Sequence, residues 1–500
     1  MAAVQPATAP TTSEPGTPEA ARGDRPVGAP GEAPGAGPRA GLPPGPRASS
    51  FVQTLAWALA PTWTMDRCAR RLGETFTLTF WPSGMKLVVV SGPEAVKTVF
   101  TAPSEVAPSA AGNSPVRPVM GESSVIVLTG PEHMRQRKLL LPPFHGERMR
   151  EYEQTIVQAT RADMASWPLG EPMRLQERTR AITLEVILRA VFGVEAERMD
   201  RLRRAIGGLL APVHPLRLVL IALSRPTVER PRGAFGEALD ELDAVIYDEL
   251  ARRREQPDLA ERTDILSLLM QARDEQGEAM TDPELRDELV TLLLAGHETT
   301  ATSVAWAIER LVRHPDNLAR LAREIDAGAA GEDDGERYMT AVVNETLRVR
   351  PVVPIVARML TAEFEVDGWR LPAGTRVTPS IYLTNRNPRV YERPAEFRPE
   401  RFLDAGPDTF AWIPFGGGIR RCIGASFAQL EMRVMLRTML GELEPSLPPT
   451  GPGGRALGAL TRRRGAPGGE WNTRRAITLV PARGARVVWR RRADRSAAAA

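Results

Sequence analysis

The chain has 500 residues, of which 42% are hydrophobic and 25% charged, and its formal net charge is +4. This hydrophobic content is typical of a globular protein with a large core, and the near-balance of charge excludes a strongly basic nucleic-acid-binding protein and an acidic tail protein. The two cysteines, Cys68 and Cys422, are too few for a disulfide framework or a cysteine-rich zinc site and are typical of a reducing compartment.

Signals for membrane insertion or secretion are missing from the pattern. No apolar stretch reaches the roughly 20 residues that a bilayer crossing needs, and the best candidate, residues 206–223, is interrupted by Pro212, Pro215 and Arg217. The N-terminal residues lack the apolar centre of a signal peptide. We therefore expect a soluble, cytoplasmic protein without a transmembrane anchor.

The composition divides the chain into a tail and one large body. Residues 1–48 are mostly Ala, Pro, Gly, Thr and Glu and have too few large apolar side chains to form a core, so we expect a disordered tail. Residues 49–500 show no internal repeat and are predicted to fold as one domain. Within them, residues 447–472 are rich in Pro, Gly and Arg, which predicts a loop or insertion.

Hydrophobic periodicity predicts a mostly helical protein with small β-sheets, an α+β fold. Two strands are expected first, at Phe76–Phe80 and Lys86–Val90, and residues 131–350 have a nearly continuous helical pattern. Strand alternation returns at Phe364–Val377 around the turn residues Asp367-Gly368. A last hairpin is expected to pair residues 476–480 with residues 485–489.

One predicted helix is unusually long. Thr281 and Glu284 have the spacing of a capping box, and His314-Pro315 ends the helical pattern. The helix would have about 32 residues and a length of roughly 48 Å. Near its centre, the run Ala295-Gly296-His297-Glu298-Thr299-Thr300 interrupts a leucine-rich pattern. These small and polar residues indicate either a functional site or a Ser/Thr-rich surface that packs on another helix.

The most informative segment is the glycine-rich run from Phe415 to Gly424, which contains Cys422 and precedes a predicted helix at 425–440. A cysteine beside a helix N-terminus is favoured as a thiolate, and the alternative is a small, buried cysteine. A thiolate there would be a nucleophile or a metal ligand. Spacing pairs none of the five histidines with Cys422, and no set of zinc ligands is evident. An axial thiolate on haem iron needs only one cysteine.

The pattern Phe-x-x-Gly-x-Arg-x-Cys-x-Gly at Phe415–Gly424 resembles the haem-binding signature of the cytochrome P-450 monooxygenases. The resemblance implies the cytochrome P-450 fold for residues 49–500 and haem b, iron protoporphyrin IX, as the cofactor. It makes Cys422 the fifth ligand of the iron and pairs Arg420 with a haem propionate. Phe415 would shield the sulfur, and Gly424 would let the next helix lie close to the porphyrin.

In the same family, the centre of the long helix crosses the distal face of the haem. The resemblance implies that Ala295, with Gly296, leaves room for dioxygen and substrate. Thr299 would hydrogen-bond the oxygen that is being activated, and Glu298 would help to relay protons, because cleavage of dioxygen needs two protons in a dry pocket. His297 is interpreted as a structural or surface residue.

Two further haem contacts follow from the resemblance. His133 and Arg137, four residues apart on one predicted helix face, correspond to the family's propionate-binding helix. Arg358 stands where the family has another propionate partner. The alternative for all three is ordinary surface charge.

A structural triad is also implied. Glu345-Thr346-Leu347-Arg348 and Phe397-Arg398-Pro399-Glu400-Arg401-Phe402 match two fold signatures of the family. The resemblance makes Glu345, Arg348 and Arg401 a buried ionic group that holds the cysteine loop in place.

The implied activity is the insertion of one oxygen atom from dioxygen into a hydrophobic small molecule. The run Leu139–Met149 is similar to a bacterial branch that includes fatty-acid and terpene hydroxylases. Residues 103–127, 206–225 and 351–356 are expected to line the pocket, and the last of these ranges is apolar. Residues 385–388 read Asn-Arg-Asn-Pro where many relatives have His-Arg-Asp-Pro, a difference expected to alter bonding near the haem loop.

No dinucleotide fingerprint or flavin-domain signature is present, so electrons would come from a ferredoxin and an NAD(P)H-dependent ferredoxin reductase. We expect Arg421, Arg433 and Arg135 to steer an acidic ferredoxin to a monomeric protein. Two other haem proteins remain possible from the sequence: a peroxide-driven peroxygenase or dehydrating isomerase, and a haem sensor or carrier. The Glu298-Thr299 pair argues against both.

Overall fold

The computed structural model describes residues 38–109, 117–144, 146, 148–193, 196–209, 233–328, 336–404, 406–449, 469–475 and 477–492. The chain divides into two units, Met1–Pro38 and Arg39–Ala500, and the described helices and strands belong to the second. Most of the predicted tail, the 206–225 region and the 447–472 insertion lies outside the described residues.

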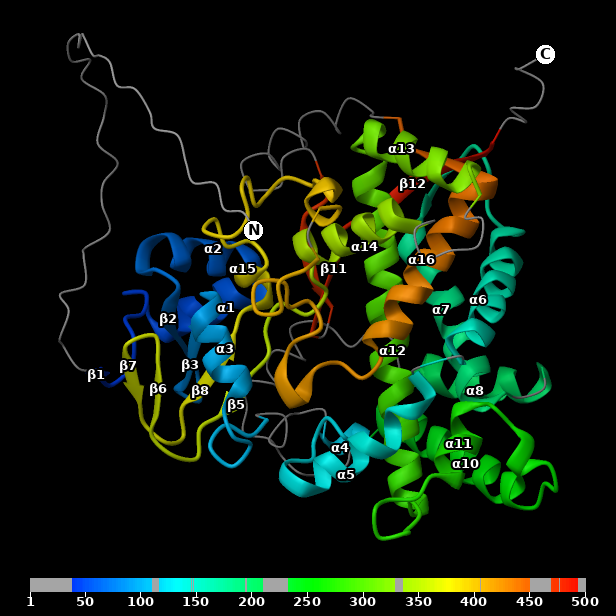
Figure 1. Ribbon diagram of the computed structural model, residues 1–500, viewed down its shortest axis with the longest axis horizontal. Coiled ribbons are helices and arrows are strands. Elements are labelled where there is room, and N and C mark those ends of the chain that lie inside the picture. Colours follow the sequence, from blue (N-terminus) through cyan, green and yellow to red (C-terminus); the bar gives the residue numbers. More distant parts are fainter. Residues whose placement is uncertain are drawn as a thin grey trace, which may run out of the picture. The chain divides into compact units, whose positions relative to one another are not determined.

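The second unit is mostly helical, as predicted (Figure 1). Its α-helices are α1 (Ser50–Leu59), α2 (Pro61–Leu72), α3 (Pro93–Thr101), α4 (Arg117–Met120), α5 (Gly130–Leu140), α6 (Arg148–Met164), α7 (Leu175–Phe192), α8 (Ala196–Leu209), α10 (Ala234–Arg254), α11 (Ile265–Gln271), α12 (Asp282–Leu311), α13 (Pro315–Asp326), α14 (Arg337–Val349), α15 (Ile381–Thr384) and α16 (Ala425–Glu442). Short 3₁₀ turns are η2 (Pro142–Phe144), η3 (Leu259–Glu261), η5 (Pro399–Phe402) and η6 (Gly418–Arg420). Within the described ranges, none of these helices combines the length and apolar character that a bilayer crossing requires.

The strands of the described residues form four small sheets. They are β1 (Arg39–Ala40), β2 (Thr75–Phe80), β3 (Met85–Val90), β4 (Pro172–Arg174), β5 (Arg358–Met359), β6 (Phe364–Val366), β7 (Trp369–Leu371), β8 (Arg376–Pro379), β9 (Leu443–Ser446), β10 (Asn472–Arg475), β11 (Thr478–Pro481) and β12 (Arg486–Arg491). The sheet orders are β2-β3-β8-β5, β1-β7-β6, β4-β12-β9 and β10-β11. The residue pattern does not predict β4, because its three residues interrupt a helical pattern and pair with β12, more than 300 residues away in sequence.

The long helix α12 is confirmed and runs through the middle of the helical part (Figure 1). Both halves of its capping box form: the Glu284 N–H is bonded to the Thr281 hydroxyl, and the Thr281 N–H donates to the Glu284 carboxylate at 2.7 Å. Four orphan N–H groups begin every helix, so this reciprocal cap stabilises the start of α12. α12 ends at Leu311, three residues before the predicted stop.

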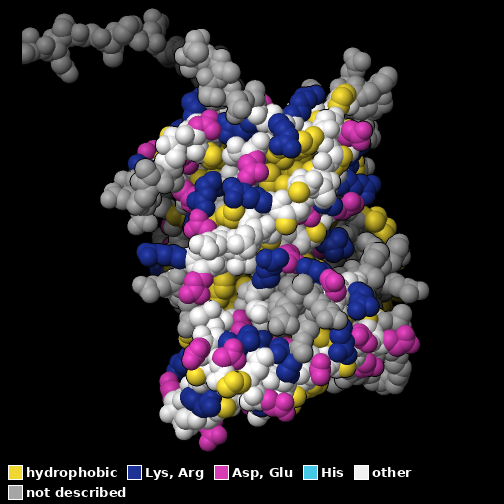
Figure 2. Space-filling model, turned by 90° about the vertical axis from the view of Figure 1, so that its right-hand side faces the viewer, with side chains coloured by type: hydrophobic (Ala, Val, Ile, Leu, Met, Phe, Trp, Pro, Cys, Tyr) yellow, Lys and Arg dark blue, Asp and Glu magenta, His cyan; other side chains and the backbone are white. Residues whose placement is uncertain are grey.

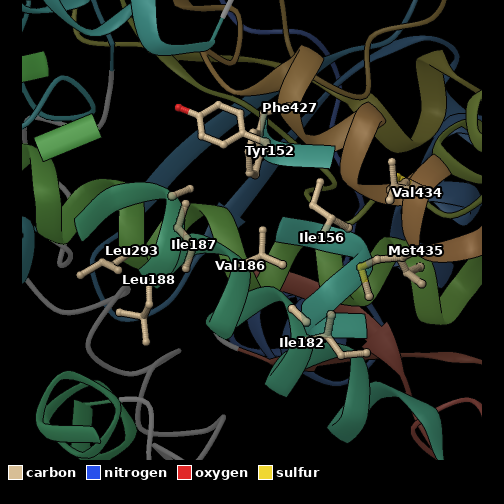
Figure 3. Close-up of a cluster of buried hydrophobic side chains, with 14 of the residues drawn as sticks. Tyr152, Ile156, Ile182, Val186, Ile187, Leu188, Leu293, Phe427, Val434 and Met435 are labelled. Carbon is tan, nitrogen blue, oxygen red and sulfur yellow. The ribbon is translucent and has the colours of Figure 1, made fainter. Parts of the chain in front are cut away.

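The main core lies where α6, α7, α12 and α16 meet (Figure 3). Ile156 of α6, Val186 of α7, Leu293 of α12 and Met435 of α16 are buried there. Phe427 of α16 packs edge-on against the ring of Tyr152, with centroids 5.2 Å apart. Burial of large aliphatic side chains stabilises the fold by about 1.5–3 kcal/mol each, so this core fixes α16 beside α12.

The folded unit begins earlier than predicted. β1 pairs in parallel with β7, and the Thr77 hydroxyl donates to the Pro43 carbonyl at 2.7 Å in a buried position. A Cβ atom on Gly45 would lie 2.5 Å from the Thr77 carbonyl oxygen. Residues 39–48, which composition assigned to the tail, are therefore part of the fold, because backbone contacts need no large apolar side chains.

The predicted last hairpin is wrong in its pairing. β11 pairs with β10, and β12 pairs with β4 and β9 in a different sheet. The buried Glu470 carboxylate accepts N–H bonds from Arg483 at 2.8 Å and Arg486 at 3.1 Å. Ala485 has a positive φ of 52°. This carboxylate-centred turn directs the chain away from β11, and nothing in the residue pattern between the two strands predicts it.

Candidate active site

Cys422 lies on a loop between η6 and α16. Its N–H donates to the Phe415 carbonyl at 3.0 Å, which closes the loop. Gly416 and Gly418 have φ angles of +69° and +63°, a region that other residues avoid. The sequence therefore needs glycine at these two positions to form the loop.

Phe100 of α3 is the surface on which this loop packs. A Cβ atom on Gly417 would lie 2.2 Å from the Phe100 ring, and one on Gly418 would lie 2.1 Å from the Phe100 carbonyl oxygen. The guanidinium of Arg358 lies over the same ring, 5.8 Å from its centroid. The sequence alone does not identify Phe100, because a glycine-rich run indicates a close neighbour without saying which one.

The Cys422 side chain is accessible, yet most of its surroundings are protein. This desolvation raises the pKa of the thiol, and the Gly424 N–H, Arg137 and Arg421 lower it only in part. The helix N-terminus therefore acts in the expected direction, through the Gly424 N–H, but desolvation of the thiol outweighs it. The sulfur needs a stronger positive charge, such as a metal ion, to lose its proton.

Four side chains that can carry positive charge meet beside this loop. The pKa of His133 falls to about 4 because of burial and then of the charges on Arg420, Arg137 and Arg358. Burial also lowers the pKa of Arg420 and of Arg358 to about 10. His133 Nδ1 is buried without a hydrogen-bond partner among the described residues. No carboxylate contributes to these shifts, so the cluster has the charge to hold an acidic ligand.

The guanidinium groups of this cluster are oriented by backbone carbonyls. Arg137 donates to the carbonyl of Arg421 at 2.7 Å, and Arg420 donates to that of Val125 at 3.0 Å. The Val125 N–H in turn donates to Glu288 of α12 at 2.8 Å. These bonds connect the cysteine loop to α12 through residues 123–128.

The centre of α12 has an exposed position on a largely buried helix. Ala295 is exposed, and the Thr299 hydroxyl, one turn later, donates to the Ala295 carbonyl at 2.8 Å. A Cβ atom on Gly296 would lie 3.4 Å from Ile187 of α7, so Gly296 serves helix packing. His297 is 1% exposed, and burial lowers its pKa to about 4, so of its two expected roles it has the structural one.

Glu298 is held by two arginines that the sequence pattern does not single out. Its carboxylate lies 2.7 Å from Arg180 of α7 and 3.8 Å from Arg475 of β10. Glu298 Oε1 accepts no hydrogen bond from the described residues. Arginine is abundant along the whole chain, so no local pattern distinguishes Arg180 or Arg475.

The expected ionic triad forms and is buried. Arg348 lies 2.6 Å from Glu345, both side chains have 0% exposure, and Arg401 lies 3.2 Å from the same carboxylate. Arg348 also donates to the carbonyl of Asn385 at 2.9 Å. The Asn385 side chain accepts the N–H of Ile413 at 2.8 Å, two residues before Phe415. Asn385, where many relatives have His, thus joins the triad to the cysteine loop.

The structure thus contains a thiol on a glycine loop, a cation cluster without acid partners in the described part of the chain, and a hydroxyl at the centre of a long helix. The sequence profile of the cytochrome P-450 family matches residues 43–456. The chain belongs to the cytochrome P-450 family. It is a monooxygenase, and members of the family carry a thiolate-ligated haem.

The relatives extend over nearly the whole chain. Cytochrome P-450 135B1 of Mycobacterium tuberculosis is 40% identical over 459 residues, which are 91% of this chain and 93% of the relative. Cytochrome P-450 137 of the same organism is 41% identical over 457 residues, 90% of this chain and 91% of the relative.

Solved structures show the same fold. The P-450DA haem domain has a TM-score of 0.76 at 22% identity, covering 92% of this chain and 98% of that one. The structure of retinoic-acid-bound cyanobacterial CYP120A1 has a TM-score of 0.73 at 23% identity, and the match covers 90% of this chain and 100% of that one.

The residues present fit a haem. Its two propionates would supply the negative charge that the His133, Arg137, Arg358 and Arg420 cluster lacks within the described residues. The described part of the chain also contains no group of three His, Cys, Asp or Glu side chains that could hold a metal ion alone. An iron bound at this cytochrome P-450 site would therefore take its other ligands from a porphyrin.

We predict that Arg348→Met lowers the free energy of unfolding by about 3–5 kcal/mol, because it leaves Glu345 buried with a weaker partner. Denaturant unfolding of the purified protein measures this loss. The matched control is Arg320→Met, since the Arg320–Glu400 pair is 3.4 Å apart and exposed. Loss of this pair should lower the free energy of unfolding by only about 0–1 kcal/mol. Equal losses in the two variants would contradict a special role for the triad.

Proposed function

We propose that this cytochrome P-450 hydroxylates an apolar small molecule of the fatty-acid or terpene kind, with Cys422 as the axial iron ligand. One observation carries the site assignment: the accessible Cys422 thiol lies beside three arginines and the neutral His133, a cluster that has no acid partner among the described residues. An anionic macrocycle with a metal centre satisfies the charge and the sulfur together. When bound, haem would activate dioxygen, with two electrons supplied by the redox partners.

Each residue of the cluster then has a role. Arg420, His133, Arg137 and Arg358 bind the propionates and orient the macrocycle. Phe415 packs edge-on against Trp412 at 6.0 Å and stiffens the loop on the cysteine side. Gly424 leaves open space, since a Cβ atom there would meet no protein atom within 4 Å. Packing within the chain therefore does not explain that glycine, and close approach of the cofactor does.

An apolar substrate is supported by the segment that follows α14. Val353 and Val356 pack with Phe100 and Ile413 in one apolar cluster. A Cβ atom on Gly416 would lie 3.9 Å from Val356, so this segment borders the cysteine loop. A wall of this kind favours the hydrocarbon part of a ligand near the reaction centre. The similarity of residues 139–149 to fatty-acid and terpene hydroxylases narrows the class.

Proton delivery is assigned to Thr299 and Glu298. The Thr299 hydroxyl uses its hydrogen to bond the Ala295 carbonyl at 2.8 Å, and rotation of the side chain would aim it at a ligand on the exposed side of Ala295. Glu298, held by Arg180 at 2.7 Å, is the adjacent proton carrier. Arg180 is a positioning residue that keeps this carboxylate in place.

We propose that electrons come from a ferredoxin and its NAD(P)H-dependent reductase. Of the three arginines that the sequence suggested for ferredoxin docking, only one keeps an available charge. Arg433 is paired with Glu336 at 3.2 Å, and Arg135 with Asp274 at 2.6 Å. Their charges are therefore largely balanced within the protein. Arg421 is exposed beside Cys422, and it is the cation that would steer an acidic partner. A cytoplasmic location follows from this choice of donor.

We predict that the reduced protein with carbon monoxide shows the absorption band that gives the family its name, and that Cys422→His abolishes this band. Loss of the thiolate ligand removes its electron donation to the iron. Absorption spectra of the haem-loaded variants test this. Cys68→Ala, at the other cysteine, which is 5% exposed and distant in sequence, should keep the band. Survival of the band in Cys422→His would exclude Cys422 as the ligand.

For proton delivery, we predict that Thr299→Ala still binds substrate and consumes NAD(P)H with surrogate partners but releases peroxide. Product per NAD(P)H should fall at least about tenfold, since positioned proton transfer contributes a factor of about 100 or more. Thr299→Ser keeps the hydroxyl and should retain most of the coupling. Normal coupling in Thr299→Ala would remove the residue from the mechanism.

For electron entry, we predict that Arg421→Gln slows reduction by ferredoxin several-fold at low salt without changing substrate affinity. The difference between the two rates should shrink as ionic strength rises, because at 0.1 M salt the attraction between exposed charges more than about 10 Å apart is largely screened. Arg433→Gln, whose charge is already paired, should change the rate by less than about twofold. Turnover by peroxide alone, with no reduction by ferredoxin, would favour a peroxygenase instead.

A further inference from the structure

The outer face of the N-terminal helices is apolar and uncovered by the described residues. Phe51, Val52, Leu55 and Leu59 of α1, Trp63 of α2 and Trp81 in the turn after β2 are 52%, 50%, 45%, 74%, 45% and 48% exposed, respectively. These are half of the twelve large hydrophobic side chains that are exposed among the described residues. We call these six side chains, together with the exposed cations Arg47, Arg67, Arg70, Arg71 and Lys86, the α1 face.

The two sides of α1 differ in their contacts. On the inner side, Gln53 accepts the N–H of Thr79 at 2.9 Å, Thr54 accepts that of Trp81 at 2.9 Å, and Trp57 packs against Phe80. These bonds fix α1 on β2. On the outer side, positions 51, 55 and 59 follow the i, i+4, i+8 spacing of one helix face. A row of this kind on a rigid base indicates a docking surface.

An aromatic contact joins this row of α1 to the turn after β2. The rings of Phe51 and Trp81 meet edge to face, with centroids 5.6 Å apart. The Arg67 guanidinium lies over the Trp63 ring at 5.3 Å. Arg67 and Trp63 are four residues apart on α2, so apolar and cationic groups share its outer face.

Within residues 47–86, which contain this surface, exposed charge is all of one sign. From residue 47 to residue 86, the exposed charged side chains are Arg47, Arg67, Arg70, Arg71 and Lys86. The two acids in that range are partly buried and bonded: Asp66 accepts from the Tyr382 hydroxyl at 3.0 Å, and Glu74 lies 3.2 Å from Arg389. By contrast, basic and acidic side chains are interspersed on the face in Figure 2.

We propose that the α1 face docks this protein on the surface of an anionic lipid bilayer. Trp63 and Trp81 have the side chains preferred at a membrane interface. Phe51, Leu55 and Leu59 would enter the acyl boundary, as in helices that lie in the interface plane. The arginines would reach headgroup phosphates, each adding attraction to the anionic surface.

Charge and composition argue against two other occupants. A second copy of the chain would bring the Arg67, Arg70 and Arg71 groups of two subunits together without acids between them. Residues 1–37 contain only Met1, Val4 and Val27 as large apolar side chains, too few to cover the row. Lipid phosphates can adjust to the spacing of the five cations, which a protein partner with fixed carboxylates would have to match.

Sedimentation of the haem-loaded full chain with vesicles tests the proposal. We expect binding to vesicles of equal parts phosphatidylglycerol and phosphatidylcholine at about 0.15 M salt, and much weaker binding to phosphatidylcholine alone. Leu55→Glu/Leu59→Glu should reduce the partition coefficient at least about tenfold. Arg67→Gln/Arg70→Gln should reduce it about fivefold per charge on anionic vesicles only.

The matched control is Leu169→Glu/Tyr247→Glu, which places two carboxylates at exposed apolar positions, 39% and 40% exposed, on other elements. This variant should bind like the wild type, and all variants should keep their carbon monoxide spectrum and thermal midpoint. Failure of the wild type to bind anionic vesicles would overturn the proposal. So would a dimer in solution that Leu55→Glu/Leu59→Glu dissociates, or tighter vesicle binding after deletion of residues 1–37.

Discussion

The cysteine loop must hold one sulfur in place although three consecutive residues before it, Gly416 to Gly418, have no side chain. Its glycines exclude Cβ atoms, so the backbone of Gly417 and Gly418 packs directly on Phe100. Asn385 binds the Ile413 N–H on one side, and Arg137 binds the Arg421 carbonyl on the other. Every one of these partners comes from a different part of the chain. The position of the reaction centre is therefore a property of the whole fold.

The buried charges of the molecule follow two different rules. Glu345 and Arg348 satisfy each other inside the protein, which makes them structural. In a second group, His133 and Arg358 are buried and Arg420 is half-buried, no acid of the described chain balances the arginine charges, and the lowered pKa values express that cost. A protein retains such a group where a ligand compensates it. This contrast separates the binding site from the scaffold.

The sequence predicts the parts of the site that depend on local chemistry. The glycines around Cys422, the Thr281 capping box and the four-residue spacing of His133 and Arg137 can all be recognised along the chain. It does not predict what distant segments bring. Arg180 reaches Glu298 only because α7 packs along α12, and Ile187 contacts Gly296 for the same reason.

The same limit explains where the structure departs from the expectations. The thiol pKa of Cys422 depends on desolvation by neighbours that are remote in sequence, and the pairing of β12 depends on the carboxylate of Glu470. Arg433 resembles a free surface cation in the sequence only because its partner, Glu336, lies nearly 100 residues earlier. Residue type gives the charge of a side chain, and the fold decides whether that charge is available.

The contact between α12 and α16 shows why availability matters next to a reaction centre. Glu431 of α16 is 2% exposed, and burial raises its pKa to about 8, with only the Thr300 hydroxyl lowering it. At neutral pH the carboxyl is therefore mostly protonated, and the two helices meet without a buried charge. Glu298, two residues before Thr300, instead pairs with Arg180. The two carboxyls near the centre of α12 are therefore stabilised in different ways: Glu431 is kept neutral by burial, and Glu298 is kept paired with an arginine of α7.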